Sequence, residues 1–194
     1  MSIVKIDNPA SLKQAADVIR SGGVLIYPTD TLYGFGVDAR NDAAVAQLVT
    51  IKGRSGPWSI VVGDWEMLKV YAKIPKLHAT EINKYLPGPV TLILPACESD
   101  ISPHILGTQK SIGTRIPDHP FPTALTQKLG FPITSTSVNR TGKPPLNSPE
   151  EIAKEFDGEF DLLIAAGIPT SSKGSTLIDL TGDMVHILRG KTDV

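Results

Sequence analysis

The sequence has one cysteine, no long apolar run and no excess of either charge, and each shortage excludes a class of protein. A lone Cys97 cannot form an intrachain disulfide or a zinc site built from several cysteines, which favours a reducing compartment. No apolar stretch approaches the roughly 20 residues that cross a bilayer, and the start MSIVKIDNPA has no signal-peptide pattern. A formal net charge of −1 with 41% hydrophobic residues excludes a disordered acidic or basic chain. These shortages predict a soluble, cytoplasmic protein without a membrane segment.

Several familiar sites are missing as well. The chain has no phosphate loop of the G-x-x-x-x-G-K-[ST] type, no G-x-G-x-x-G dinucleotide turn, and no H-E-x-x-H or C-x-x-C metal pattern. Its four histidines lie far apart without the spacing of metal ligands, so we assign no metal site. Any nucleotide binding therefore has to use a less common arrangement.

The chain is short and rich in turn-forming residues. Its 194 residues favour one domain, 1–194, because domains average roughly 150 residues and no shift in composition marks a boundary. The 17 glycines and 16 prolines occur in clusters between periodic segments, which predicts structured turns and substrate loops.

Hydrophobic periodicity predicts strands that alternate with helices. Asn8 is expected to cap the first helix, and Asp64 and Ser148 two later ones, whereas residues 28–38 are expected to form a structured loop. The extra hairpins predict mixed strand directions in an α/β sheet. Strands are expected at 3–6, 24–27, 59–62, 90–94, 111–116, 133–137, 162–165, 175–180 and 185–188, and further helices at 41–52, 77–85 and 120–129.

Four polar loops each follow an expected strand or helix: PTDT (28–31), KGR (52–54), SIGTR (111–115) and STSVN (135–139). Strand ends are where ligands gather in α/β sheets, because short loops there can direct donors into one crevice. The cations of these loops are Lys52, Arg54 and Arg115, which suit phosphate or carboxylate groups. In strand geometry Ser135, Ser137 and Asn139 point to one side, a row that suits a sugar or a phosphate.

Position alone leaves plainer interpretations open. The three cations would then be solvated surface charges, and the serines and asparagine a turn whose hydroxyls bind its own backbone. By the same reasoning Thr29 and Thr31 would cap a turn, and Tyr33 would belong to the core.

Taken together, the motifs resemble those of the YrdC-type threonylcarbamoyl-adenylate synthase family. The resemblance extends from about residue 11 to residue 189 and includes, in order, PTDTLYGFGVDA, IKGR, LPGPVTLIL, IGTRIPDHP, TSTSVNRTGKPP, GSTLIDLTG and ILRGK. It implies a twisted, mixed α/β sheet with surrounding helices and a large concave, positively lined cavity. The implied reaction joins L-threonine, bicarbonate and ATP into threonylcarbamoyl-AMP and pyrophosphate. That product feeds the threonylcarbamoyl modification of adenosine in tRNA through a downstream transferase.

The resemblance also implies roles for individual residues. The K-x-R motif falls on Lys52 and Arg54, which are the expected catalytic residues. Thr29, Thr31, Tyr33 and Arg115 are expected on the threonine side. The nucleotide is expected to meet Lys52, Arg54, Ser135, Ser137, Asn139 and Arg189, with Mg²⁺ accompanying ATP and held mainly by phosphates and water.

The sequence departs from the family pattern after KGR. The family usually has a proline there, then a lysine or asparagine before a Pro-Leu pair, whereas SGPWSIVV places Trp58 and Ser59 at those positions. This departure keeps a YciO-like relative with a different nucleotide-dependent substrate as an alternative. Enzymes that make carbamoyl-adenylate from carbamoyl phosphate normally carry cysteine motifs that are absent here. A third alternative is weak RNA binding by the concave face, to which the net charge of −1 lends no support.

Overall fold

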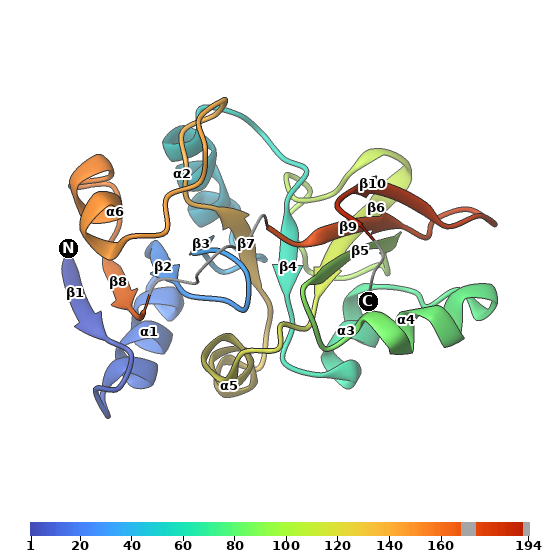
Figure 1. The fold of residues 1–194 in the computed structure, drawn as a ribbon, viewed down its shortest axis with the longest axis horizontal. Coiled ribbons are helices and arrows are strands. Elements are labelled where there is room, and N and C mark those ends of the chain that lie inside the picture. The colour runs from blue at the N-terminus through green and yellow to red at the C-terminus, as the bar shows by residue number, and fades with distance from the viewer. Residues whose placement is uncertain (168–173, 192–194) are drawn as a thin grey trace.

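The computed structural model describes residues 1–167 and 174–191, in which ten strands form one twisted sheet (Figure 1). The order across the sheet is β1-β8-β2-β3-β7-β4-β6-β5-β9-β10. The strands are β1 (Ser2–Lys5), β2 (Leu25–Tyr27), β3 (Gly34–Gly36), β4 (Ser59–Val61), β5 (Val90–Pro95), β6 (Ser111–Arg115), β7 (Ile133–Ser137), β8 (Leu162–Ala165), β9 (Thr176–Asp179) and β10 (His186–Arg189). The α-helices are α1 (Ser11–Arg20), α2 (Asp42–Lys52), α3 (Trp65–Tyr71), α4 (Ala79–Tyr85), α5 (Pro120–Leu129) and α6 (Pro149–Glu155).

Strand directions are mixed, as the hairpin-rich pattern predicts. The pairs β1–β8, β2–β8, β4–β6 and β5–β9 are parallel, whereas β2–β3, β3–β7, β4–β7, β5–β6 and β9–β10 are antiparallel. The predicted α/β class is therefore confirmed.

Side-chain alternation divides the core between the two faces of the sheet. On β2, Leu25 and Tyr27 belong to one cluster of buried residues with α1 and α5, whereas Ile26 between them belongs to a second cluster with α2. Successive strand residues point to opposite faces, so one short strand serves both clusters. None of the helices in the described part of the chain is long and apolar enough to cross a membrane.

Two local predictions are wrong. The expected loop at 28–38 contains β3, because β2 and β7 on either side supply hydrogen bonds that local propensity does not reveal. The first helix is not capped by Asn8, since its N-cap position is Ala10. Asn8 instead accepts a hydrogen bond from the Ala10 backbone N–H at 2.9 Å, which closes a turn just before the helix. The caps predicted at Asp64 and Ser148 are confirmed.

The two glycines of β3 allow close packing against Tyr27. A Cβ atom on Gly36 would lie 2.7 Å from Cε1 of Tyr27, a side chain that is fully buried and donates a hydrogen bond to the Thr134 carbonyl oxygen at 3.0 Å. The tyrosine ring thus fills the space that a side chain at position 36 would need.

We expect Gly36→Ala to lower the free energy of unfolding by about 1–3 kcal/mol, because the held ring cannot make room. Gly167→Ala is the matched control, since a Cβ there meets no atom of the described residues within 4 Å and the residue is exposed. Urea unfolding of both variants measures the difference. Equal stability of the two variants would contradict the close packing.

Candidate functional site

A cavity of about 330 Å³ lies where polar loops and strands β3–β7, β9 and β10 converge. Eight of the ten residues nominated from the sequence line it: Thr29, Thr31, Tyr33, Arg54, Arg115, Ser135, Ser137 and Arg189. Lys52 and Asn139 do not line it. The described lining includes three arginines and no carboxylate, whereas the large concave, positively lined shape stays a prediction.

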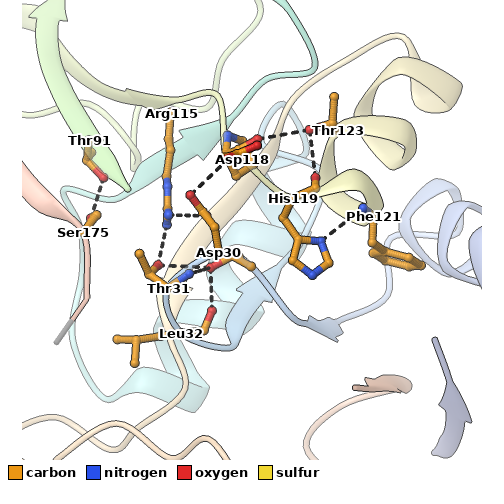
Figure 2. Close-up of polar contacts among 12 residues, drawn as sticks. Asp30, Thr31, Leu32, Thr91, Arg115, Asp118, His119, Phe121, Thr123 and Ser175 are labelled. Atoms are coloured by element: carbon orange, nitrogen blue, oxygen red, sulfur yellow. Dashed lines mark hydrogen bonds and ion pairs between the residues drawn. The ribbon is translucent and has the colours of Figure 1, made fainter. Parts of the chain in front are cut away.

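A buried ion pair between Arg115 and Asp30 organises one side of the cavity (Figure 2). Arg115 ends β6, and its NH2 group donates to a carboxylate oxygen of Asp30, while its NH1 group donates to Oγ1 of Thr31 at 2.8 Å. The other Asp30 oxygen accepts from the Asp118 backbone N–H at 3.1 Å. The two side chains are 5% and 10% exposed, so solvent screens this pair little. The pair holds together the end of β6, the loop after β2 and the loop before α5.

The two threonine hydroxyls form a chain with a defined direction. Thr29 Oγ1 donates to the Leu32 carbonyl oxygen at 2.7 Å, so in its 3.1 Å contact with Thr31 Oγ1 it can only accept. Thr31 Oγ1 therefore donates to Thr29 and accepts from Arg115. Both hydroxyl hydrogens are used inside the protein, and a remaining lone pair of Thr31 is left for a ligand.

The hydroxyl of Tyr33 is fully used by the backbone. It donates to the Ala166 carbonyl oxygen at 2.9 Å and accepts from the Ala166 N–H at 2.8 Å. Burial raises the pKa of this phenol, so it stays neutral near pH 7. Tyr33 therefore contributes a side of the cavity, and its hydroxyl joins the segment between β2 and β3 to Ala166, directly after β8.

Lys52 lies at the end of α2 and points away from open solvent, with 3% of its surface exposed. Its Nζ donates to the carbonyl oxygens of Ser137 and Asn139 at 2.7 and 2.8 Å and to Oδ1 of Asn139 at 2.7 Å. Burial, followed by the charge of Arg54, lowers the pKa of Lys52 to about 8. Of the expected row of Ser135, Ser137 and Asn139, the first two line the cavity, whereas Asn139 lies beyond the end of β7 and its Oδ1 accepts from both Ser137 Oγ and Lys52 Nζ.

The other two cations are more accessible. Arg54 is exposed, its NH1 group donates to the Ser55 carbonyl oxygen at 3.0 Å, and it forms no ion pair with any residue that the structure describes. Arg189 donates from Nε and NH2 to the Ser175 carbonyl oxygen at 3.1 and 3.0 Å. Oγ of Ser175 lies 2.7 Å from Oγ1 of Thr91, which extends this polar wall to β5 (Figure 2).

Sequence reasoning missed several residues of the site. Asp30 stands inside the PTDT motif, and its charge beside Arg115 becomes visible only when the fold joins the loop to β6. Trp58, Thr91 and Ser175 also line the cavity. Trp58 Nε1 and Arg115 Nε are buried without a hydrogen-bond partner among the described residues. Thr91 and Ser175 stand inside the motifs LPGPVTLIL and GSTLIDLTG, but the motifs alone do not show that these two side chains face the cavity.

Within the described residues, no group of three or more histidine, cysteine, aspartate or glutamate side chains is arranged to hold a metal ion. The carboxylate of Asp30 already accepts hydrogen bonds from the Arg115 guanidinium and from the Asp118 backbone N–H.

The order and spacing of these motifs agree with a known family. The Sua5/YciO/YrdC family model, which carries the description telomere recombination, matches residues 17–190. The chain belongs to this family. The resemblance inferred from the sequence is thereby confirmed.

Individual members are similar over nearly the whole chain. The threonylcarbamoyl-AMP synthase of Bacillus subtilis (strain 168) is 31% identical over 185 residues, which cover 94% of this chain and 54% of that protein. The structure of P. abyssi Sua5 complexed with L-threonine is 32% identical with a TM-score of 0.90, covering 97% of this chain and 57% of that one. E. coli YciO is 29% identical with a TM-score of 0.86, covering 96% and 93%. The chain thus spans about half the length of the synthase relatives.

We expect Asp30→Ala to destabilise the fold by about 3 kcal/mol, because it leaves the buried Arg115 guanidinium without its counter-ion. Glu66→Ala is the control, since it removes a carboxylate from an exposed pair with Lys69 and should change stability little. Thermal or urea unfolding of the two variants measures the contrast. An Asp30→Ala protein as stable as the Glu66→Ala protein would show that the pair does not organise this side of the cavity.

Proposed function

We propose that the chain is an L-threonylcarbamoyladenylate synthase, a nucleotidyltransferase that makes threonylcarbamoyl-AMP and pyrophosphate from L-threonine, bicarbonate and ATP. The observation that carries the proposal is a buried arginine, Arg115, beside two threonines in a polar cavity of a family whose B. subtilis member bears this name. The P. abyssi relative complexed with L-threonine supports an amino-acid pocket in the same fold.

The reaction needs positioning more than covalent chemistry from the protein. The threonine amine takes up bicarbonate as a carbamate with loss of water, and a carbamate oxygen attacks the α-phosphorus of ATP while pyrophosphate leaves. Two anions must approach each other, so cations and oriented donors supply most of the rate enhancement. Arg54, exposed at the cavity and without a carboxylate partner in the described structure, is placed to meet phosphate charge. Arg189, at the end of β10 in the β9–β10 hairpin, offers a second guanidinium.

Lys52 contributes indirectly in this proposal. Its ammonium already binds three oxygens of Ser137 and Asn139, so it supports the nucleotide side of the cavity by holding these residues. Ser135 and Ser137 then face the nucleotide, and Asn139 belongs to the support. When ATP binds, Mg²⁺ would be held by its phosphate oxygens and by water, neutralising charge on the triphosphate.

In this proposal the amino acid lies beside Arg115. Arg115 is the proposed partner of the threonine carboxylate: its NH1 and NH2 groups already donate to Thr31 and Asp30, and its Nε–H is a donor that no described residue uses. Thr31 offers a lone pair, and Thr29 and the ring of Tyr33 shape the pocket. We place this activity in one domain, 1–194, in the cytoplasm, with a downstream transferase consuming the product in tRNA modification.

The proposed reaction is tested by omission. We expect pyrophosphate release only when the purified protein is given ATP, L-threonine and bicarbonate together, and threonylcarbamoyl-AMP as the second product by mass spectrometry. Pyrophosphate release that persists without threonine would sink the assignment and favour the YciO-like alternative with another substrate. Binding of RNA without turnover would favour the RNA-binding alternative.

The role of Arg54 has its own test. We expect Arg54→Ala to reduce kcat/KM for ATP on the order of a hundredfold, because it removes a cation that stabilises phosphate charge in the transition state. Lys69→Ala removes an exposed cation on α3, outside the cavity lining, and should leave turnover unchanged. Steady-state pyrophosphate release measures both variants. Near-normal turnover of Arg54→Ala would rule out a phosphate contact for this side chain.

A further inference from the structure

The backbone between α2 and β4 determines where Arg54 lies. Residues 53–58, named here the Arg54 segment, cross from the end of α2 to the start of β4 (Figure 1). Arg54, Pro57 and Trp58 of this segment line the cavity. The exposed guanidinium of Arg54 donates from NH1 to the carbonyl oxygen of Ser55, its neighbour in the same segment, at 3.0 Å. A shift of this backbone would therefore move the cation.

Both ends of the Arg54 segment are fixed. Lys52, the last residue of α2, donates to three oxygens of residues 137 and 139. Ser59, the first residue of β4, pairs with Gly113 of β6 and with Ser135 of β7. The middle of the segment is thus the part whose position is still open, and a second loop lies against it.

This second loop comprises residues 101–107 and is named here the supporting loop. A Cβ atom on Gly56 would lie 2.5 Å from the carbonyl oxygen of His104, which is closer than Cβ atoms come to other atoms in proteins. The clashing atom belongs to the backbone, so no side-chain rotation relieves the contact. The φ angle of Gly56 is outside the left-handed region, so space and not backbone conformation requires a glycine. Beside it, the Trp58 N–H donates to the Ile105 carbonyl oxygen at 3.2 Å.

The supporting loop is itself anchored in the protein. Ile105 is fully buried in the same hydrophobic cluster as Trp58. The Ser102 N–H donates to the Ala39 carbonyl oxygen at 3.0 Å, and the Gly107 N–H donates to the carbonyl oxygen of the first residue of β6 at 2.8 Å. Because packed interiors transmit strain, a displacement forced at this contact falls on the more exposed Arg54 segment.

We propose that Gly56 is a positioning residue, which through its contact with the supporting loop sets where Arg54 meets the phosphates of ATP. The proposal rests on the proposed function and deepens it. It also gives a role to SGPW, the sequence by which this chain departs from the family pattern, since the glycine permits the close contact and Trp58 anchors the segment in the core. Stabilisation of phosphate charge depends on fixed geometry, and a misplacement of about 1 Å costs on the order of a hundredfold in rate.

The test is a double-mutant cycle of Gly56→Ala, Arg54→Ala and the variant with both changes, measured as kcat/KM for ATP from pyrophosphate release. We expect Gly56→Ala alone to lower kcat/KM about tenfold, because the added methyl group displaces the Arg54 segment. In the Arg54→Ala background the same change should lower it less than about twofold, since the cation that it misplaces is already gone. Gly182→Ala is the matched control and should leave kcat/KM unchanged. Gly182 is exposed and outside the cavity lining, and a Cβ there meets no atom of the described residues within 4 Å.

Two further measurements separate positioning from a general loss of structure. Calorimetric titration should give the same L-threonine affinity for Gly56→Ala and wild type, because Arg115 and Thr31 lie on other elements. Urea unfolding shows whether Gly56→Ala folds. If it does not fold, Ile105→Val takes its place in the cycle. That change shortens a buried side chain of the supporting loop by one carbon, and we expect the same pattern with a smaller loss.

Equal losses in the two backgrounds would overturn the proposal, as would an unchanged kcat/KM in the folded variant or a threonine affinity that falls together with kcat/KM for ATP. Near-normal turnover of Arg54→Ala would remove the phosphate contact and this inference with it. Wild-type protein that releases no pyrophosphate with ATP, L-threonine and bicarbonate is a separate result, which overturns the proposed function itself.

Discussion

The buried ion pair between Arg115 and Asp30 is the contact on which the cavity depends. It connects a strand end with two loops that are distant in sequence, and the same guanidinium donates to Oγ1 of Thr31. Removing one partner of a buried ion pair lowers stability strongly, because the remaining partner is then a buried charge without a counter-ion. The geometry of this side of the cavity thus depends on one electrostatic contact.

A second buried cation, Lys52, lies outside the cavity lining and binds the backbone of Ser137, which is part of that lining. There a buried ammonium faces only neutral oxygens, and its charge is balanced by the dipoles of carbonyls and an amide. An ion pair between side chains thus holds the end of β6, and an ammonium bound mainly by backbone oxygens holds the end of β7. Arg54 lines the cavity and is exposed, without a carboxylate partner among the described residues.

Much of this fold follows from local pattern. The alternation of Leu25, Ile26 and Tyr27 predicts a buried strand, and Asp64 and Ser148 predict helix starts, because these signals act within a few residues. β3 cannot be predicted from the sequence, because its pairing with β2 and β7, and not its own Gly-Phe-Gly sequence, makes it a strand. The motifs placed most site residues at the cavity, but the partner of each polar atom depends on contacts across the fold. Asp30 and the three oxygens around Lys52 are examples that spacing alone does not reveal.

The contacts of Lys52 with residues 137 and 139 span more than 80 positions of the chain. Closing so long a segment costs chain entropy before any bond forms, and contacts of this kind slow folding relative to local ones. The contacts of Lys52 with the turn after β7 therefore cannot form in a partly synthesised chain that ends before β7. The cavity is lined by residues as late in the chain as Ser175 and Arg189, so it is complete only when the last strands of the sheet, β9 and β10, are in place.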